Sequence, residues 1–234
     1  FLYNRIKKDL PIELIEDYKY WSRNSFSSYI PKVILSDNLH IQNAKFKHWL
    51  ANCLEKGSKV LLTAHGGSIC QSNYMNFQEE ISDRYFSWKK PTHSKHKQLP
   101  PLNYTNLKIN KRSKGEFISL IGVDFPIYIF RCQRAGSGSE VYKHHKQFLV
   151  LYKYLNKDLK KIFKFKPYYQ SFRGLLKEYE KEFGKKSIEN IDLKEFINNS
   201  KLVIASYPQT TFSDCIIRNK PTILLYPSDV WIIT

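Results

Sequence analysis

The sequence predicts an α/β protein in which parallel β-sheets are covered by helices. Strand-like apolar runs alternate with helix-like segments along most of the chain, and this alternation indicates βαβ units. Residues 31–37 and 59–64 are short apolar runs, and the segment 44–57 between them has helical spacing. The chain has 234 residues, of which 42% are hydrophobic, so it can bury a sizeable core as one large or two small domains.

The first half of the chain holds a predicted strand–helix–strand unit. Gly57 ends the helical segment 44–57 at the place where a C-cap is expected. The apolar residues of this helix recur at helical spacing, which predicts a core-facing stripe rather than a ligand site: Phe46, Trp49, Leu50 and Leu54. A further helical stretch within residues 72–88 leads into another short strand.

Residues 89–115 separate two parts of the chain. They are polar and basic, contain three prolines and show little periodicity, which is typical of a linker or an extended surface loop. The sequence therefore predicts a first domain at 1–88 and a second at 116–234. The chain begins without Met and stops just after a strand-like run, so we expect a fragment of a longer protein.

The second part repeats the alternation of strands and helices. Its strand-like runs are 116–124, 126–133, 162–167, 201–208 and 221–227. Its helix-like runs are 141–159, 172–186, 191–200 and 210–220. Asp192 is a predicted N-cap, because Glu195 follows at the spacing of a capping box. The Gly and Ser stretch at 134–140 favours a flexible loop over a phosphate cradle, since no Lys-Ser pair follows it.

The composition limits the class of function. The net charge is +17, from 38 Lys and Arg against 21 Asp and Glu, which favours an anionic partner such as nucleic acid, a phosphorylated substrate or a membrane surface. A composition rich in Lys, Asn, Ile and Tyr, as low-GC coding sequences produce, explains the same charge, so both interpretations stay open. No stretch approaches the length of a membrane span, and we expect a soluble, intracellular protein.

The cysteines and histidines indicate neither a metal site nor a disulfide framework. The four cysteines are widely spaced and form no CxxC pair: Cys53, Cys70, Cys132 and Cys215. We expect reduced, mostly buried thiols. The seven histidines are scattered along the chain, so no metal cluster is expected.

One loop in the first half suits acid–base chemistry. Ligands of open α/β sheets bind at the carboxyl ends of the strands. His65 follows the strand-like run 59–64, and Gly66 and Gly67 allow a tight turn and a close approach to a ligand. His65 is therefore a candidate general base, since the pKa of imidazole lies near working pH. The alternative is a hydrogen-bonded histidine at an ordinary turn.

A second loop suits phosphate binding. The strand-like run 201–208 is followed by three hydroxyl residues at a predicted helix start: Thr210, Thr211 and Ser213. The free N–H groups and the positive dipole end of a helix start bind phosphate well. Ordinary helix capping explains Thr and Ser there equally. Together the two loops suit group transfer from a phosphate-activated donor to a hydroxyl.

Three segments resemble a family of transferases from bacterial surface-carbohydrate gene clusters. They are FKHWLANCLEKGSKVLLTAHGG at 46–67, EEISDRYFSW at 79–88 and FINNSKLVIASYPQTTFSDCIIRNKPTILLYPSDVW at 196–231. That family is similar to the GT-B glycosyltransferases, in which two Rossmann-like domains face each other across a cleft. The resemblance implies an acceptor-side domain at 1–88 and a nucleotide-sugar-binding domain at 116–234, both incomplete in this chain.

The resemblance also implies roles for individual residues. A similar arrangement occurs in the CDP-glycerol polymerases of wall teichoic acid and in Kdo and sialic-acid-type transferases. By this likeness His65 is the base, in a turn shaped by Gly66 and Gly67, and Asp214 contacts the donor ribose. The implied ligands of the donor phosphates are Thr210, Thr211 and Ser213. An arginine is expected after the basic helix, where Gln170 and Arg173 lie nearby.

The implied activity is transfer of a sugar from a nucleotide-activated donor, for which CMP is one option, to a polysaccharide of the capsule or lipopolysaccharide type. The expected partners are the nucleotide-sugar and a glycan or lipid-linked glycan, with no nucleic acid, metal or cofactor. The expected place is the cytoplasm, with peripheral contact to an anionic inner membrane as an option. Two alternatives stay open: a basic, non-catalytic nucleic-acid-binding protein and an inactive truncated transferase.

Overall fold

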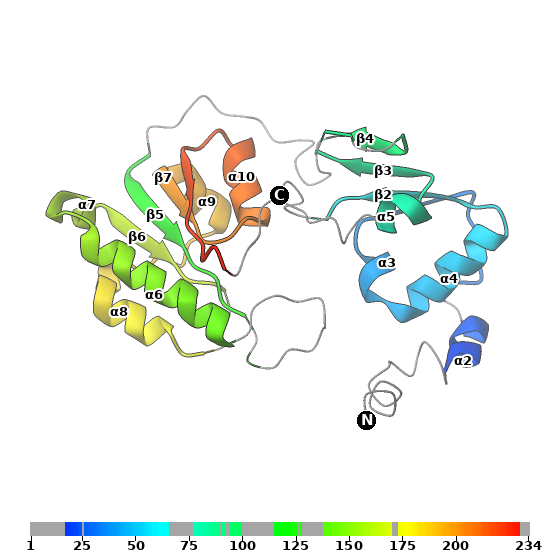
Figure 1. Cartoon of the computed structure of the whole chain (residues 1–234), viewed down its shortest axis with the longest axis horizontal. Helices are drawn as coiled ribbons and strands as arrows, with labels where there is room; N and C mark the ends of the chain where they lie inside the picture. Colours follow the sequence, from blue (N-terminus) through cyan, green and yellow to red (C-terminus); the bar gives the residue numbers. More distant parts are fainter. Residues whose placement is uncertain are drawn as a thin grey trace. The chain divides into compact units, whose positions relative to one another are not determined.

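The computed structural model divides the chain into two compact units. It describes residues 17–24, 26–65, 77–88, 90–91, 94–99, 115–125, 127, 138–169 and 173–229. The described residues up to 99 form the N-terminal unit, and those from 115 onward form the C-terminal unit. Each unit contains one four-stranded sheet whose strand pairs are all parallel. The predicted α/β class with Rossmann-like parallel sheets is therefore confirmed (Figure 1).

The N-terminal unit has strand order β1-β2-β3-β4. Its strands are β1 (Val33–Ser36), β2 (Lys59–Thr63), β3 (Arg84–Ser87) and β4 (His96–Gln98). Its helices are α2 (Tyr18–Arg23), α3 (Leu39–Gln42), α4 (Ala44–Glu55) and α5 (Phe77–Ile81).

Helix α4 forms the main cover of this sheet. Asn43 caps its start, because the Asn43 side chain accepts a hydrogen bond from the N–H of Phe46 at 2.8 Å. Gly57, with φ of 88°, follows its end as predicted. Three of the four predicted core residues are buried against β1, β2 and β3: Phe46, Trp49 and Leu50. Leu54 is exposed instead, and its neighbour Cys53 takes the buried position in the last turn of the helix.

Strand β4 lies within the range 89–115, where a linker or loop was expected. It pairs with β3 through a short parallel register that includes Tyr85 opposite His96. Apart from the buried His96, β4 consists of exposed polar residues, so its sequence lacks the apolar run that signals a strand. A strand at a sheet edge needs no such run, because one side of it faces solvent.

The C-terminal unit has strand order β6-β5-β7-β8. Its strands are β5 (Phe117–Ile121), β6 (Phe163–Lys166), β7 (Ser200–Ala205) and β8 (Thr222–Leu224). Its helices are α6 (Gly138–Tyr154), α7 (Lys157–Lys161), α8 (Leu176–Phe183), the 3-10 turn η5 (Lys185–Ser187), α9 (Leu193–Asn199) and α10 (Thr210–Ile217).

Helices cover both faces of this sheet (Figure 1). Ile118 and Leu120 of β5 pack with the core residues of α6 and α8 on one face. Phe117 and Ile121 alternate with them and pack with residues of α9 and α10 on the other face. Strand β5 is accordingly buried along its whole length, as central parallel strands are.

Two helix boundaries differ from the sequence expectation. The predicted helix 141–159 is divided into α6 and α7, because Asn156 caps a new start by accepting from the N–H of Leu159 at 2.9 Å. The predicted helix 172–186 ends at Phe183, since Gly184 adopts a positive φ of 83°. The predicted strand 126–133 lies almost wholly outside the described residues.

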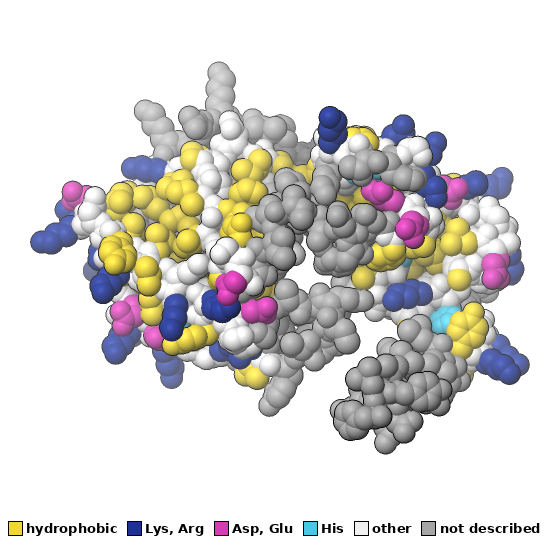
Figure 2. All heavy atoms as spheres, viewed as in Figure 1, with side chains coloured by type: hydrophobic (Ala, Val, Ile, Leu, Met, Phe, Trp, Pro, Cys, Tyr) yellow, Lys and Arg dark blue, Asp and Glu magenta, His cyan; other side chains and the backbone are white. Residues whose placement is uncertain are grey.

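Charge is spread over both units. Figure 2 shows Lys and Arg side chains distributed over the visible surface of each unit.

In the described part of the chain, no helix combines the length and apolarity needed to cross a bilayer.

Candidate functional site

His65 stands at the carboxyl edge of the N-terminal sheet, just after β2. Asp37 stands at the same edge, just after β1, which is the parallel neighbour of β2. The parallel register brings the two side chains together, and Asp37 Oδ2 lies 3.2 Å from His65 Nδ1. Both side chains are about half exposed, at 55% for His65 and 54% for Asp37. The edge thus presents an imidazole that is held at Nδ1 and accessible from solvent.

A second histidine lies behind this pair. His40 of α3 is buried, and its Nδ1 lies 3.1 Å from Ser36 Oγ. Burial lowers the pKa of His40, and the charge of His65 lowers it further. A hydrogen bond with Gln78 and the charge of Asp37 act in the opposite direction but do not outweigh burial. His40 is therefore neutral near pH 7, and His65 is the exposed histidine of this edge. The predicted turn residues Gly66 and Gly67 lie outside the described residues.

The predicted phosphate site lies at the carboxyl edge of the C-terminal sheet, between β7 and α10. Thr210 and Thr211 are the first two residues of α10, and Thr210 is exposed while Thr211 is half-buried. The N-cap residue Gln209 makes no side-chain hydrogen bond to the helix start. The Gln209 side chain therefore does not occupy the N–H groups at the start of α10, and N–H groups at a helix start suit an anion.

Two buried hydroxyls flank this helix start. Ser206 directly follows β7 and is 2% exposed, and Ser213 in the first turn of α10 is fully buried. Among the described residues, neither Oγ atom has a hydrogen-bond partner. Buried hydroxyls are nearly always hydrogen-bonded, so two orphaned ones beside one helix start call for an explanation. Ser213 was predicted from the sequence, whereas Ser206 was not.

The topology places this turn where α/β sheets bind ligands. Strand β6 extends the sheet from one side of β5, and β7 and β8 extend it from the other side. From β5 the chain adds β6 on one side and then crosses to β7 on the other, so the carboxyl ends of the parallel strands β5 and β7 form a switch point. Phe125 and Tyr207, which follow β5 and β7, meet there edge to face with ring centroids 6.5 Å apart. Asp124 is buried beside them, and its carboxylate accepts from the N–H of Phe125 at 2.8 Å.

Asp214 has a partner within its own helix. Its Oδ1 accepts a hydrogen bond from Arg218 Nε at 2.8 Å, and both side chains are about nine-tenths buried. The predicted contact with a donor ribose would thus involve a carboxylate already paired with Arg218.

The Arg173 side chain, from the segment that precedes α8, lies close to the first residue of α6. A Cβ atom added at Gly138, the first residue of that helix, would lie 3.4 Å from Arg173 Nη1. Of the two positions named for the expected arginine or its equivalent, Gln170 lies outside the described residues. Arg173 therefore brings its guanidinium to the N-terminus of α6, where a second group of helix N–H donors begins.

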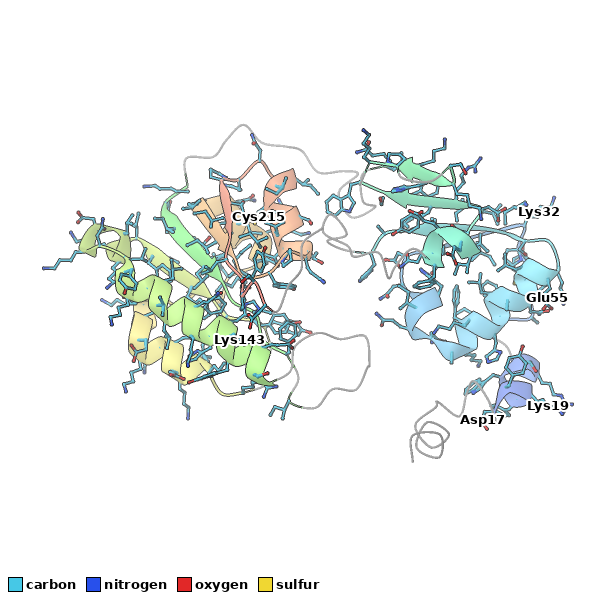
Figure 3. All side chains as sticks on the ribbon, in the orientation of Figure 1. Asp17, Lys19, Lys32, Glu55, Lys143 and Cys215 are labelled. Carbon is cyan, nitrogen blue, oxygen red and sulfur yellow. The ribbon has the colours of Figure 1, made fainter. Side chains whose placement is uncertain are left out.

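The described cysteines are structural. Cys53 and Cys215 are both buried and free, as predicted, and Figure 3 labels Cys215 on α10. Burial raises the pKa of Cys215 to about 12, and the charge of Asp214 adds to this rise. Cys70 and Cys132 lie outside the described residues. Within the described ranges, no group of three metal-ligating side chains comes together.

Comparison with known proteins supports a transferase. A family model described as LIC12162 family transferase matches residues 1–234, which is the entire chain. No curated protein matches the sequence. The family description agrees with the group-transfer chemistry predicted from the two loops, and it specifies neither the transferred group nor the acceptor. Since the match spans every residue, the chain belongs to the LIC12162 family of transferases.

Proposed function

We propose that this transferase is a glycosyltransferase that moves a sugar from a nucleotide-activated donor to a hydroxyl of a bacterial surface glycan. The observation that carries the proposal is the pair of buried, unpartnered hydroxyls of Ser206 and Ser213 at the start of α10. Phosphate oxygens are strong acceptors that would satisfy both hydroxyls. The donor phosphates would then lie at the switch point of the C-terminal sheet.

The start of α10 suits the leaving group of such a reaction. When the sugar–phosphate bond breaks, negative charge grows on the departing phosphate oxygen. The N–H groups of the first turn and the hydroxyls of Thr210 and Thr211 supply donors to that charge without reorganisation. Asp214 is proposed for the donor ribose, sharing its carboxylate between the ribose and Arg218.

His65 is proposed as the base that activates the acceptor. With Nδ1–H donating to Asp37, the lone pair lies on Nε2. Nε2 takes the proton of the acceptor hydroxyl as that oxygen attacks the anomeric carbon. The bond from this carbon to the phosphate oxygen breaks, and its electron pair leaves with the nucleotide.

The acceptor and the location rest on the resemblance. We propose a glycan or lipid-linked glycan acceptor and a cytoplasmic site of action. The donor nucleotide is proposed as the substrate itself, with no further cofactor. Gly66 and Gly67 are proposed to shape the turn after His65.

Thermal unfolding with and without nucleotides tests the proposal, because it predicts that changing either serine weakens nucleotide binding without lowering the stability of the unliganded protein. Removing an unpartnered buried hydroxyl costs no protein hydrogen bond, so Ser206→Ala and Ser213→Ala should leave the unliganded melting temperature unchanged or raise it. The same changes should weaken nucleotide binding by about fivefold each, the value of a lost hydrogen bond of about 1 kcal/mol. The probes are CMP, CDP, UDP and GDP and their sugar conjugates.

Ser200→Ala is the matched control. Ser200 is equally buried, but its hydroxyl donates to Phe196 O at 2.7 Å and contacts Ser119 Oγ at 2.9 Å. This variant should lose stability and keep its nucleotide affinity. If no nucleotide raises the melting temperature of the unmodified protein, the proposed donor site is wrong.

A further inference from the structure

The exposed surface of α6 is unusual in composition. Between residues 141 and 154, every exposed side chain is Lys, Tyr or Val. We call this set the α6 surface, and it consists of Tyr142, Lys143, Lys146, Val150, Lys153 and Tyr154. No Asp or Glu occurs anywhere from 141 to 157. From residue 141 onward the outer face of this helix is thus basic and aromatic, and the acidic residue of α6, Glu140 in its first turn, is half-buried.

The apolar members of the α6 surface are strongly exposed. Tyr142, Val150 and Tyr154 are 55%, 53% and 81% exposed. They recur at intervals of eight and four residues, so they lie on one i, i+4 row that spans about 18 Å at 1.5 Å per residue and winds about 120° around the helix axis. Hydrophobic and Lys side chains lie side by side over the region of α6 in Figure 2.

The lysines are interspersed with these apolar residues, since Lys146 lies between Tyr142 and Val150 on the same row. Lys146 Nζ lies 4.7 Å from the centroid of the Tyr142 ring, which places a cation over an aromatic face. Lys160 of α7 donates to Lys153 O and brings another ammonium to the far end of the helix. Lys143, labelled in Figure 3, pairs with Asp229, the one acidic partner recorded for the α6 surface within the described residues.

Helix α8 of the same unit shows what an ordinary solvated helix looks like here. Its exposed positions alternate in charge: Lys177, Glu178, Lys181 and Glu182. They include no exposed large apolar side chain. The high net charge of the chain therefore does not by itself produce the pattern on α6.

We propose that the α6 surface binds an anionic lipid bilayer. Tyrosine side chains favour the boundary between apolar and aqueous phases, and an aliphatic side chain such as Val150 gains by leaving water for the acyl region. The lysines among them reach lipid phosphates while their methylene stems stay on the apolar surface. A nucleic acid would use the lysines and the tyrosine rings but would gain nothing from Val150. The proposal concerns a different surface from the turn between β7 and α10, and it stands without the nucleotide site.

Vesicle co-sedimentation tests this proposal with the unmodified chain. The protein should sediment with vesicles of phosphatidylcholine mixed with phosphatidylglycerol and stay in solution with phosphatidylcholine alone. Lys146→Gln and Lys153→Gln should each lower the vesicle affinity about fivefold, as expected for one lysine near an anionic surface. Changing Tyr142, Val150 and Tyr154 together to Ser should also lower it, although the net charge is unchanged.

The matched controls are the single changes Lys177→Gln and Lys181→Gln on α8, each of which removes the same charge from the same unit. All these positions are exposed, so circular dichroism should show an unchanged fold. An equal loss of vesicle binding from the α8 changes would overturn the proposal, since it would show a general charge effect. Vesicle binding that survives the triple Ser change, with equally tight binding to single-stranded RNA, would also overturn it.

Discussion

At the scale of single residues, the pairing of His65 with Asp37 decides what the N-terminal unit can do. Both side chains are about half exposed, so their electrostatic attraction is screened and adds little to stability. The value of the contact is orientation, because a base contributes to rate only if its lone pair points at the proton it removes. Asp37 is therefore a positioning residue for His65.

Replacing Asp37 with Asn should lower turnover with only a small change in KM. The loss should be about tenfold, the equivalent of a charge-assisted hydrogen bond of about 1.5 kcal/mol. His65→Ala should lower turnover by about a hundredfold or more, as expected for a missing general base. Steady-state kinetics with donor and acceptor measures both values. Asp158→Asn, at an exposed position on α7, is the control and should keep full turnover. An Asp37→Asn enzyme that keeps full turnover across the pH range would contradict the positioning role of Asp37.

The sequence predicts some site residues and misses others for a physical reason. His65 is visible because two glycines follow it at the end of an apolar run. Asp37 cannot be recognised in the sequence, because an Asp after a strand is common. Only the parallel register of β1 and β2 brings it to His65. Ser206 is likewise hidden, because its burial and its lack of a partner are properties of the folded turn.

At the scale of elements, prediction succeeds where the apolar period or a cap is strong. The strand-like runs around β2, β5 and β7 carry long apolar stretches, and the structure confirms them. Asp192 caps α9 as predicted, by accepting from the N–H groups of Lys194 and Glu195. Prediction fails for β4, because three mostly polar residues at a sheet edge leave no apolar period to detect.

Asp83 shows how one carboxylate joins two elements. It precedes β3 and accepts hydrogen bonds from the N–H of Val60 at 2.8 Å and from Lys59 Nζ at 3.1 Å, both on β2. These contacts lower the pKa of Asp83 below its ordinary value, and the hydrogen bond from Val60 N–H has the largest effect. The ionised carboxylate therefore stabilises the folded state above the unfolded pKa, and this stability is lost as the pH falls through the lower folded pKa.

Asp83→Asn should accordingly change the pH dependence of stability. At neutral pH the variant should be less stable than the unmodified protein. The difference should shrink as the pH falls below the ordinary Asp pKa of about 3.9 and toward the lower folded pKa, where the native carboxylate also becomes protonated. Urea unfolding at a series of pH values measures the difference. A gap between the two proteins that stays constant from neutral to acid pH would show that the charge of Asp83 does not stabilise the fold.

At the scale of the whole molecule, both units follow one plan. Each places its polar candidate residues at the carboxyl edge of a parallel sheet, where the ends of neighbouring strands lie side by side. The alternation of strands and helices predicts this plan from sequence alone. The orphaned hydroxyls and the uniform surface of α6 could not be predicted, since both depend on which side chains the packing buries.

The central claim is that the donor phosphates bind at the turn between β7 and α10. Amide NMR spectra of the isotope-labelled chain, titrated with the nucleotide that most raises its melting temperature, test this claim most directly. The account predicts that the largest shifts fall on the N–H groups of Thr210, Thr211 and Phe212 and on neighbouring Ser206. Shifts confined to residues away from this turn, such as those of α7 and η5, would contradict it.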